Sequence, residues 1–181
     1  HKHPAAIEDV VDGFNQLTLL FSPKNIILLG DSAGGQLALV LLLKLKQMRL
    51  EQPKAVVTFS AFTESSDELP SRQFNKYNDP SFGCVEGKQE ESVKVPYFDG
   101  CDLTQDDISP IRGEFTETAP ILMHVGSLEM LLSDSVEFAK KEGVQLKVFE
   151  DMFHVFQLAP YLREAKQSIQ LVGEFITEQF K

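Results

Sequence analysis

Short apolar runs alternate along this chain with longer segments in which apolar residues recur every three or four positions. The short runs predict strands over residues 25–29, 55–60, 120–126 and 144–150. The longer segments predict helices over residues 4–20, 36–50, about 132–142, and from 160 to the end. Strands that alternate with helices form parallel sheets with right-handed crossovers. The pattern therefore predicts an α/β fold, a mostly parallel sheet flanked by helices.

The composition of each segment predicts how deeply it is buried. The first three strands are apolar at nearly every position, which is typical of strands covered on both faces. The fourth strand alternates, so Val144, Leu146 and Val148 predict one buried face near the sheet edge. The helix that begins at residue 36 is apolar nearly all round from Leu37 to Leu43, which predicts that it is buried.

Each of the other three helices carries one apolar stripe, which predicts the face turned toward the core. The expected inner positions are, helix by helix, Ile7, Val10, Val11, Phe14 and Leu17; then Leu132, Val136 and Ala139; then Leu162, Ala165, Ile169, Val172, Ile176 and Phe180. Gly143 is expected to end the second of these helices.

Residues 61–119 interrupt this regular alternation. They are rich in Pro, Gly, Asp and Ser, with scattered aromatic residues at Phe74, Tyr77, Phe82, Tyr97 and Phe98. A stretch this long without periodicity is usually functional, although a plain surface excursion is the alternative. With 181 residues, of which 43% are hydrophobic, the chain is expected to form one domain over residues 1–181.

The first predicted strand runs directly into Gly30-Asp31-Ser32-Ala33-Gly34. A serine at an abrupt strand-to-helix turn is the nucleophile elbow of α/β-hydrolases. Gly30 and Gly34 are expected to be needed, because the turn brings strand and helix too close for a Cβ. The turn would lift the Ser32 hydroxyl off the sheet and aim the Ala33 N–H at a developing oxyanion. A tight turn with an ordinary serine is the alternative, and the glycine spacing matches neither a dinucleotide-binding motif nor a P-loop.

A serine nucleophile needs a base within hydrogen-bond reach. His154 follows the last predicted strand, and in a parallel sheet the carboxyl ends of all strands meet at one edge. Ser32 and His154 are therefore expected to lie together. His124 falls inside a buried strand, where a structural histidine is the better interpretation, while His1 and His3 lie at the terminus.

The acid that orients the histidine should follow the intervening strand, where the chain offers Glu129 and Asp134. Glu129 lies in the loop at the working edge and is preferred. Asp134 falls at the start of a helix, where an acid is as well suited to capping that helix and to its dipole. The order Ser, Glu, His is that of α/β-hydrolases.

The segment Gly30-Asp31-Ser32-Ala33-Gly34-Gly35 resembles the hormone-sensitive-lipase-like branch of the α/β-hydrolase esterases. The likeness continues in residues 4–9, 107–111, 126–131 and 151–156. The resemblance implies that Ser32 is the nucleophile, His154 the general base and acid, Glu129 the orienting acid and Ala33 an oxyanion donor. The family more often carries Asp where Glu129 stands. The resemblance also implies that part of residues 61–119 lines the substrate pocket.

Two departures from that family affect the expectations. Its His-Gly-Gly-Gly loop and N-terminal strands have no counterpart in the 31 residues before Ser32. The chain is therefore expected to be part of a longer protein or a truncated product, poorly soluble or weakly active alone, with one side of its first strand unpaired. Clean esterase kinetics from residues 1–181 would contradict this. Second, Glu129 and His154 are only 25 residues apart, which leaves the length of the intervening helix open.

Composition limits the partners. The net charge of −10 disfavours nucleic acid and anionic membrane surfaces, and no apolar run reaches 18 residues, so no transmembrane segment is expected. No His/Cys cluster has ligand spacing, so no metal or organic cofactor is expected. Cys84 and Cys101 are expected to be free thiols, which favours a cytoplasmic location. Oligomeric state stays open.

Together these features predict a serine hydrolase that acts through an acyl-enzyme, and the resemblance implies small, apolar carboxylic esters as its substrates. Met152, Phe153 and Phe156 around His154 are consistent with such a substrate, or with core packing. Amide hydrolysis or deacetylation by the same triad is the second enzymatic reading. A small-molecule-binding protein of the same fold without catalysis is the alternative from another class.

Overall fold

The computed structural model describes residues 1–66, 68–83 and 96–181. Four parallel strands form one sheet in the order β1-β2-β3-β4: β1 (Ile27–Asp31), β2 (Ala55–Phe59), β3 (Ile121–Gly126) and β4 (Val144–Phe149). Strand order thus follows chain order, and the carboxyl ends of all four strands lie at one edge of the sheet. The predicted α/β architecture with a parallel sheet is confirmed.

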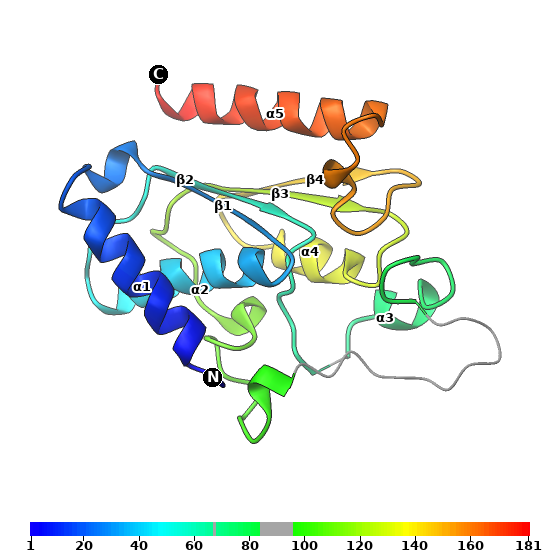
Figure 1. Ribbon diagram of the computed structural model, residues 1–181, viewed down its shortest axis with the longest axis horizontal. Coiled ribbons are helices and arrows are strands. Elements are labelled where there is room, and N and C mark those ends of the chain that lie inside the picture. Colours follow the sequence, from blue (N-terminus) through cyan, green and yellow to red (C-terminus); the bar gives the residue numbers. More distant parts are fainter. Residues whose placement is uncertain (67, 84–95) are drawn as a thin grey trace.

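Helices cover both faces of the sheet (Figure 1). One face packs against α5 (Arg163–Gln179), through Val172 and Phe175. The other packs against α2 (Ala33–Gln47) and α4 (Leu132–Phe138), with α1 (Ala5–Thr18) lying outside α2. Leu39 and Leu42 of α2 are fully buried, as the apolar character of this helix predicted.

Strand burial follows the predictions in three of four cases. Strands β2 and β3 are buried at every position, and β4 is an edge strand whose alternate residues are half-buried. The prediction of a buried first strand is wrong for β1, where Leu29 is 55% exposed. Strand β1 forms the other edge of the described sheet, and aliphatic composition does not report whether a strand has neighbours on both sides.

Three helical faces also differ in part from the predictions, and in α1 Leu17 is exposed while Ile7 and Phe14 are buried as expected. Helix α4 ends at Phe138, not near residue 142, and Phe138 is fully buried while Val136 is exposed. Helix α5 begins at Arg163, and its residue Ile169 is exposed, as is Phe180 directly after the helix. The buried positions of α5 are Ala165, Ser168, Val172 and Phe175. The apolar spacing misled because Ser168 and the polar start of α4 are buried through hydrogen bonds, which a hydrophobic pattern cannot register.

The excursion between β2 and β3 contains the short helix α3 (Ser71–Phe74) and single 3-10 turns at Pro96–Phe98 and Pro110–Arg112. Phe74 and Tyr77 are exposed, whereas Phe98 is buried. Cys101 is a free thiol, and Cys84 lies outside the described residues. Within the described part of the chain, every helix is too short or too polar to cross a bilayer.

Candidate active site

Ser32 stands at the sharp turn between β1 and α2, with φ 52° and ψ −119°. Such a backbone is strained for a residue with a Cβ and persists only where its surroundings fix it. The end of β2 fixes this one on both sides. The Ser32 N–H donates to the Phe59 carbonyl at 2.9 Å, and the Phe62 N–H donates to the Ser32 carbonyl at 3.3 Å. The elbow predicted from the sequence is thus present.

The glycines of the elbow have unequal roles. A Cβ on Gly30 would lie 2.3 Å from the Gly34 carbonyl oxygen, and one on Gly35 would lie 2.8 Å from the Ala61 Cβ. A Cβ on Gly34 would meet no atom within 4 Å among the described residues outside its own helix. The expectation for Gly30 is confirmed and that for Gly34 is wrong. Gly35 is needed instead, because α2 approaches the segment that follows β2, a contact that the motif alone does not contain.

Ala33 is the first residue of α2 and lines a cavity beside Ser32. The first four N–H groups of a helix have no partner within the helix, and they carry the positive end of its dipole. The N–H of Gln36 is used by the turn itself, since it donates to the Ser32 carbonyl at 3.1 Å. The position of Ala33 thus suits the oxyanion donor that was expected.

His154 and Glu129 face each other at the same edge of the sheet. His154 Nδ1 lies 3.1 Å from Glu129 Oε2, with 9% of the histidine side chain and 0% of the glutamate side chain exposed. The other carboxylate oxygen, Oε1, accepts hydrogen bonds from the Gly126 N–H at 2.6 Å and from the Ser60 hydroxyl at 2.8 Å. The short α4, seven residues long, accommodates the 25-residue separation of this pair.

Asp134 contacts the excursion between β2 and β3 and has a structural role. Its carboxylate accepts from the N–H groups of Thr63 and Glu64 at 2.8 and 3.1 Å and pairs with Arg72 at 2.9 Å. Burial raises the pKa of the Asp134 carboxyl to about 6, although Arg72 and the two N–H groups favour the charged form. Among the hydrogen bonds of the described residues, none joins Asp134 to His154, and its side chain does not cap α4. This carboxylate fastens the excursion to α4.

Ser60 is a buried site residue that sequence reasoning missed. It follows β2, has φ 50°, and its hydroxyl lies between Glu129 and the Val155 N–H, which donates to it at 3.0 Å. A serine that ends a buried strand belongs to no motif. The only available signal was position, since Ser32, Glu129 and His154 also follow strands of this sheet.

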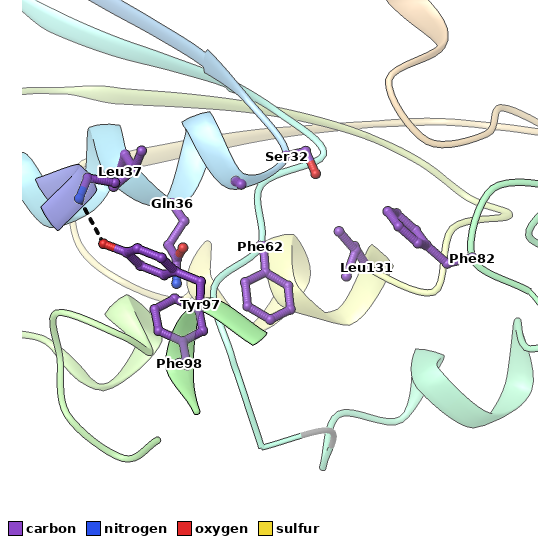
Figure 2. Close-up of a pocket in the computed structure, with 10 residues that line it drawn as sticks. Ser32, Gln36, Leu37, Phe62, Phe82, Tyr97, Phe98 and Leu131 are labelled. Atoms are coloured by element: carbon purple, nitrogen blue, oxygen red, sulfur yellow. Dashed lines mark hydrogen bonds between the residues drawn. The ribbon is translucent and has the colours of Figure 1, made fainter. Parts of the chain in front are cut away.

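A cavity of about 300 Å³ opens beside Ser32 (Figure 2). Its other lining residues are almost all apolar: Ala6, Ala33, Leu37, Phe62, Phe82, Tyr97, Phe98 and Leu131, together with Gln36. Both polar side chains of this wall take part in one hydrogen bond each, since the Tyr97 hydroxyl accepts the Ala6 N–H at 2.9 Å and Gln36 Nε2 donates to the Ile108 carbonyl. The ring of Phe82 meets that of His154 edge-on at 4.6 Å between centroids, which links the cavity to the histidine.

The Ser32 hydroxyl makes no hydrogen bond with His154 among the described contacts. Catalytic hydrogen bonds are often long before substrate binds, and a serine hydroxyl turns about one bond. Met152, Phe153 and Phe156 pack with Phe149 and Ala165 in a core cluster beneath α5. Their interpretation as core is therefore the correct one.

His124 is fully buried in β3, with Nδ1 2.8 Å from the Ser168 hydroxyl of α5. Burial, with a smaller contribution from the Lys147 charge, lowers the pKa of His124 to about 4. This side chain is therefore neutral at physiological pH and ties the sheet to α5. The structural interpretation of His124 is confirmed. His3 contacts Asp107, Tyr97 and Phe98.

Known proteins resemble the chain over nearly all its length. Residues 1–158 match the family described as alpha/beta hydrolase fold. An esterase of Acinetobacter venetianus is 32% identical over 98% of this chain and 60% of its own, and an acetyl-hydrolase of Streptomyces hygroscopicus is 30% identical over 96% and 59%. The crystal structure of the hormone-sensitive-lipase homologue EstE7 from a metagenome library superposes with a TM-score of 0.90 at 30% identity, covering 100% of this chain and 64% of that one.

The chain thus spans about three fifths of the length of these curated relatives. Its elbow, its strand order and its family match agree with one another. The chain belongs to the α/β-hydrolase fold family, in the branch of the hormone-sensitive-lipase-like esterases.

Proposed function

We propose that this protein is a serine hydrolase that cleaves small carboxylic esters through an acyl-enzyme. The observation that carries the proposal is the 3.1 Å contact between His154 Nδ1 and the buried carboxylate of Glu129, at the sheet edge where the strained elbow of Ser32 lies. A carboxylate on Nδ1 leaves Nε2 unprotonated and able to accept a proton, which is the state that a general base requires. Esterases among the relatives support the same reaction class.

In the proposed cycle, the Ser32 oxygen attacks the ester carbonyl while His154 Nε2 takes the hydroxyl proton. The Ala33 N–H and the N-terminus of α2 stabilise the oxyanion, because both present positive charge to it. His154 then delivers its proton to the leaving alkoxide, and water repeats the sequence on the acyl-enzyme. Glu129 holds the imidazole in one tautomer and stabilises the imidazolium, without itself taking the proton.

The cavity beside Ser32 supports small, apolar substrates. Its volume of about 300 Å³ is at the lower limit of ligand pockets, and Phe62, Phe98 and Leu131 offer no hydrogen bond to a polar group. The Tyr97 oxygen and Gln36 Nε2, from the two polar side chains of the wall apart from Ser32, already make hydrogen bonds to the chain. Esters with short apolar groups therefore suit this space better than charged or sugar-like ones.

Labelling with a fluorophosphonate, followed by mass spectrometry of the modified peptide, tests the proposal. Modification at Ser32 is expected in the wild-type chain and in Ser135→Ala, whose buried hydroxyl has no hydrogen-bond partner among the described residues. Ser32→Ala should lose both the label and the hydrolysis of p-nitrophenyl esters. A folded wild-type chain that binds esters but takes no label would show a binding protein instead.

A further inference from the structure

The buried hydroxyl of Ser60 occupies a junction between the acid and the base of the proposed site. The hydroxyl donates a hydrogen bond to Glu129 Oε1 at 2.8 Å, and its oxygen accepts one from the Val155 N–H at 3.0 Å. Val155 is the residue directly after His154, so one oxygen atom bonds both to the acid and to the backbone beside the base. Ser60 itself is 0% exposed, and no solvent can replace either bond.

The two oxygens of Glu129 have separate partners. Oε1 is held by the Ser60 hydroxyl and the Gly126 N–H, and Oε2 faces His154. A carboxylate with only one of these donors could turn about its last bond and move Oε2 away from the imidazole. The second donor on Oε1 therefore fixes the direction in which Oε2 points.

The backbone on both sides of the junction is strained. Ser60 has φ 50°, and Val155 has φ 50°, which is a genuine outlier for a β-branched residue. The Ser60 N–H is fixed by the His124 carbonyl of β3 at 2.8 Å. Strained positions persist where the surroundings over-determine them, and the Ser60 hydroxyl is one of the groups that hold the Val155 peptide.

We propose that Ser60 is a positioning residue of the hydrolase: its hydroxyl sets the orientation of the Glu129 carboxylate and of the His154 loop together, without touching substrate. This inference rests on the proposed function for its kinetic consequence and on the hydrogen bonds alone for its geometry. Phe59 and Phe62 of the same segment make the peptide hydrogen bonds that hold the Ser32 elbow, so the end of β2 and the residues just after it support all three proposed catalytic side chains.

Ser60→Ala tests the proposal, with Thr58→Val as the matched control. Thr58 is a fully buried hydroxyl of the same strand whose oxygen has no hydrogen-bond partner among the described residues. Ser60→Ala should lower kcat on p-nitrophenyl esters by about 10- to 100-fold with KM changed less than about threefold, since orienting hydrogen bonds of this kind carry such factors. Thr58→Val should leave both constants within about twofold.

Ser60→Gly separates the hydroxyl from the backbone. Glycine adopts a positive φ without strain, so this variant should be at least as stable as Ser60→Ala in a thermal melt and equally slow. If Ser60→Ala does not fold, Ser60→Cys, which keeps a side chain of similar size with a weak donor, should give an intermediate kcat. Folded Ser60→Ala and Ser60→Gly proteins with wild-type kcat would overturn the proposal, as would an equal loss in Thr58→Val.

Proton NMR of the hydrogen-bonded Nδ1–H of His154, assigned through His154→Asn, gives a readout that needs no turnover. Its resonance should shift or broaden in Ser60→Ala and Ser60→Gly and stay in place in Thr58→Val. A wild-type chain with no activity would count against the proposed function, and this resonance would still decide the role of Ser60. An unchanged resonance in both Ser60 variants would refute the positioning role.

Discussion

Glu129 and Asp134 are two buried carboxylates five residues apart, and their surroundings assign them different work. Glu129 has one oxygen fixed by Gly126 and Ser60 and the other free to face His154. Asp134 spends both oxygens on Arg72 and the Thr63 and Glu64 N–H groups. The position of Glu129 in a loop was enough to favour it from the sequence. The ion pair of Asp134 could not be predicted, because its partner Arg72 lies some 60 residues earlier in the chain.

Replacing each acid by its amide should separate these roles. In Glu129→Gln the amide oxygen can keep the bonds from Gly126 and Ser60, which turns the NH₂ group toward His154 and favours the wrong tautomer. We expect kcat to fall by about 10³- to 10⁴-fold with little loss of stability. Asp134→Asn replaces the buried negative charge that pairs with Arg72 by a neutral amide, so it should lower the free energy of unfolding by about 3–5 kcal/mol.

Urea unfolding and ester kinetics on the same two proteins measure both effects. The kcat of folded Asp134→Asn should stay within about tenfold of wild type, because no hydrogen bond among the described residues joins the Asp134 carboxylate to His154. Equal loss of kcat in the two variants would show that the acid has been assigned wrongly.

His124 makes stability depend on pH. Its pKa is lowered to about 4 in the folded protein, against an ordinary value of 6.5, so between these values the unfolded chain binds the extra proton. The contribution is complete above pH 6.5 and is lost as the pH falls toward 4. We expect a loss of roughly 2 kcal/mol between pH 7 and pH 5, measured by urea unfolding as wild type minus His124→Asn. A difference that stays constant over this range would contradict the burial of a neutral imidazole.

At the scale of elements, the strand-turn-helix of the elbow could be predicted from its residues, but the faces of α4 and α5 could be predicted only in part: Ala165 and Val172 are buried as expected, whereas Ile169 is exposed. Motif and apolar runs are local, whereas the buried face of α5 includes Ser168 because His124 of β3 lies opposite it. The same distinction explains the glycines: the close approach at Gly35 is to Ala61, which no motif spacing contains.

Alanine substitution at two elbow glycines should therefore have opposite outcomes. Gly30→Ala places a methyl group 2.3 Å from the backbone oxygen of Gly34, which can yield only if the elbow opens. We expect a loss of about 1–3 kcal/mol in the free energy of unfolding and about 100-fold in kcat, as Ser32 is displaced. Gly34→Ala meets open space and should gain up to about 1 kcal/mol from helix propensity with kcat preserved.

Thermal unfolding and ester kinetics compare the two variants directly. A severe loss in Gly34→Ala would show that this glycine is needed for a contact with substrate, since among the described residues outside its own helix no atom lies within 4 Å of its Cβ position.

At the scale of the whole molecule, one topological rule made the site predictable. Ser32, Glu129 and His154 follow β1, β3 and β4, and parallel pairing gathers these strand ends at one edge. The rule also applies to β2, which Ser60 follows. Serine is too common a residue type for its position alone to predict a role, so the role of Ser60 could be inferred only from its contacts in the structure. The rule does not predict how exposed the two edge strands of the sheet are.

The two edges differ in a way that predicts association. The β4 edge presents the exposed polar residues Gln145 and Lys147, whereas the β1 edge presents Leu29 at 55% exposure, with the charged Asp31 exposed only at the end of the strand. Charged side chains on an edge strand hinder pairing with another sheet, and an apolar edge invites it. Leu29→Lys should therefore reduce concentration-dependent association, measured by sedimentation velocity, with stability changed by less than about 0.5 kcal/mol. Lys147→Leu should increase association through the opposite edge. If both variants sediment as the wild-type chain does, edge pairing plays no part in its assembly.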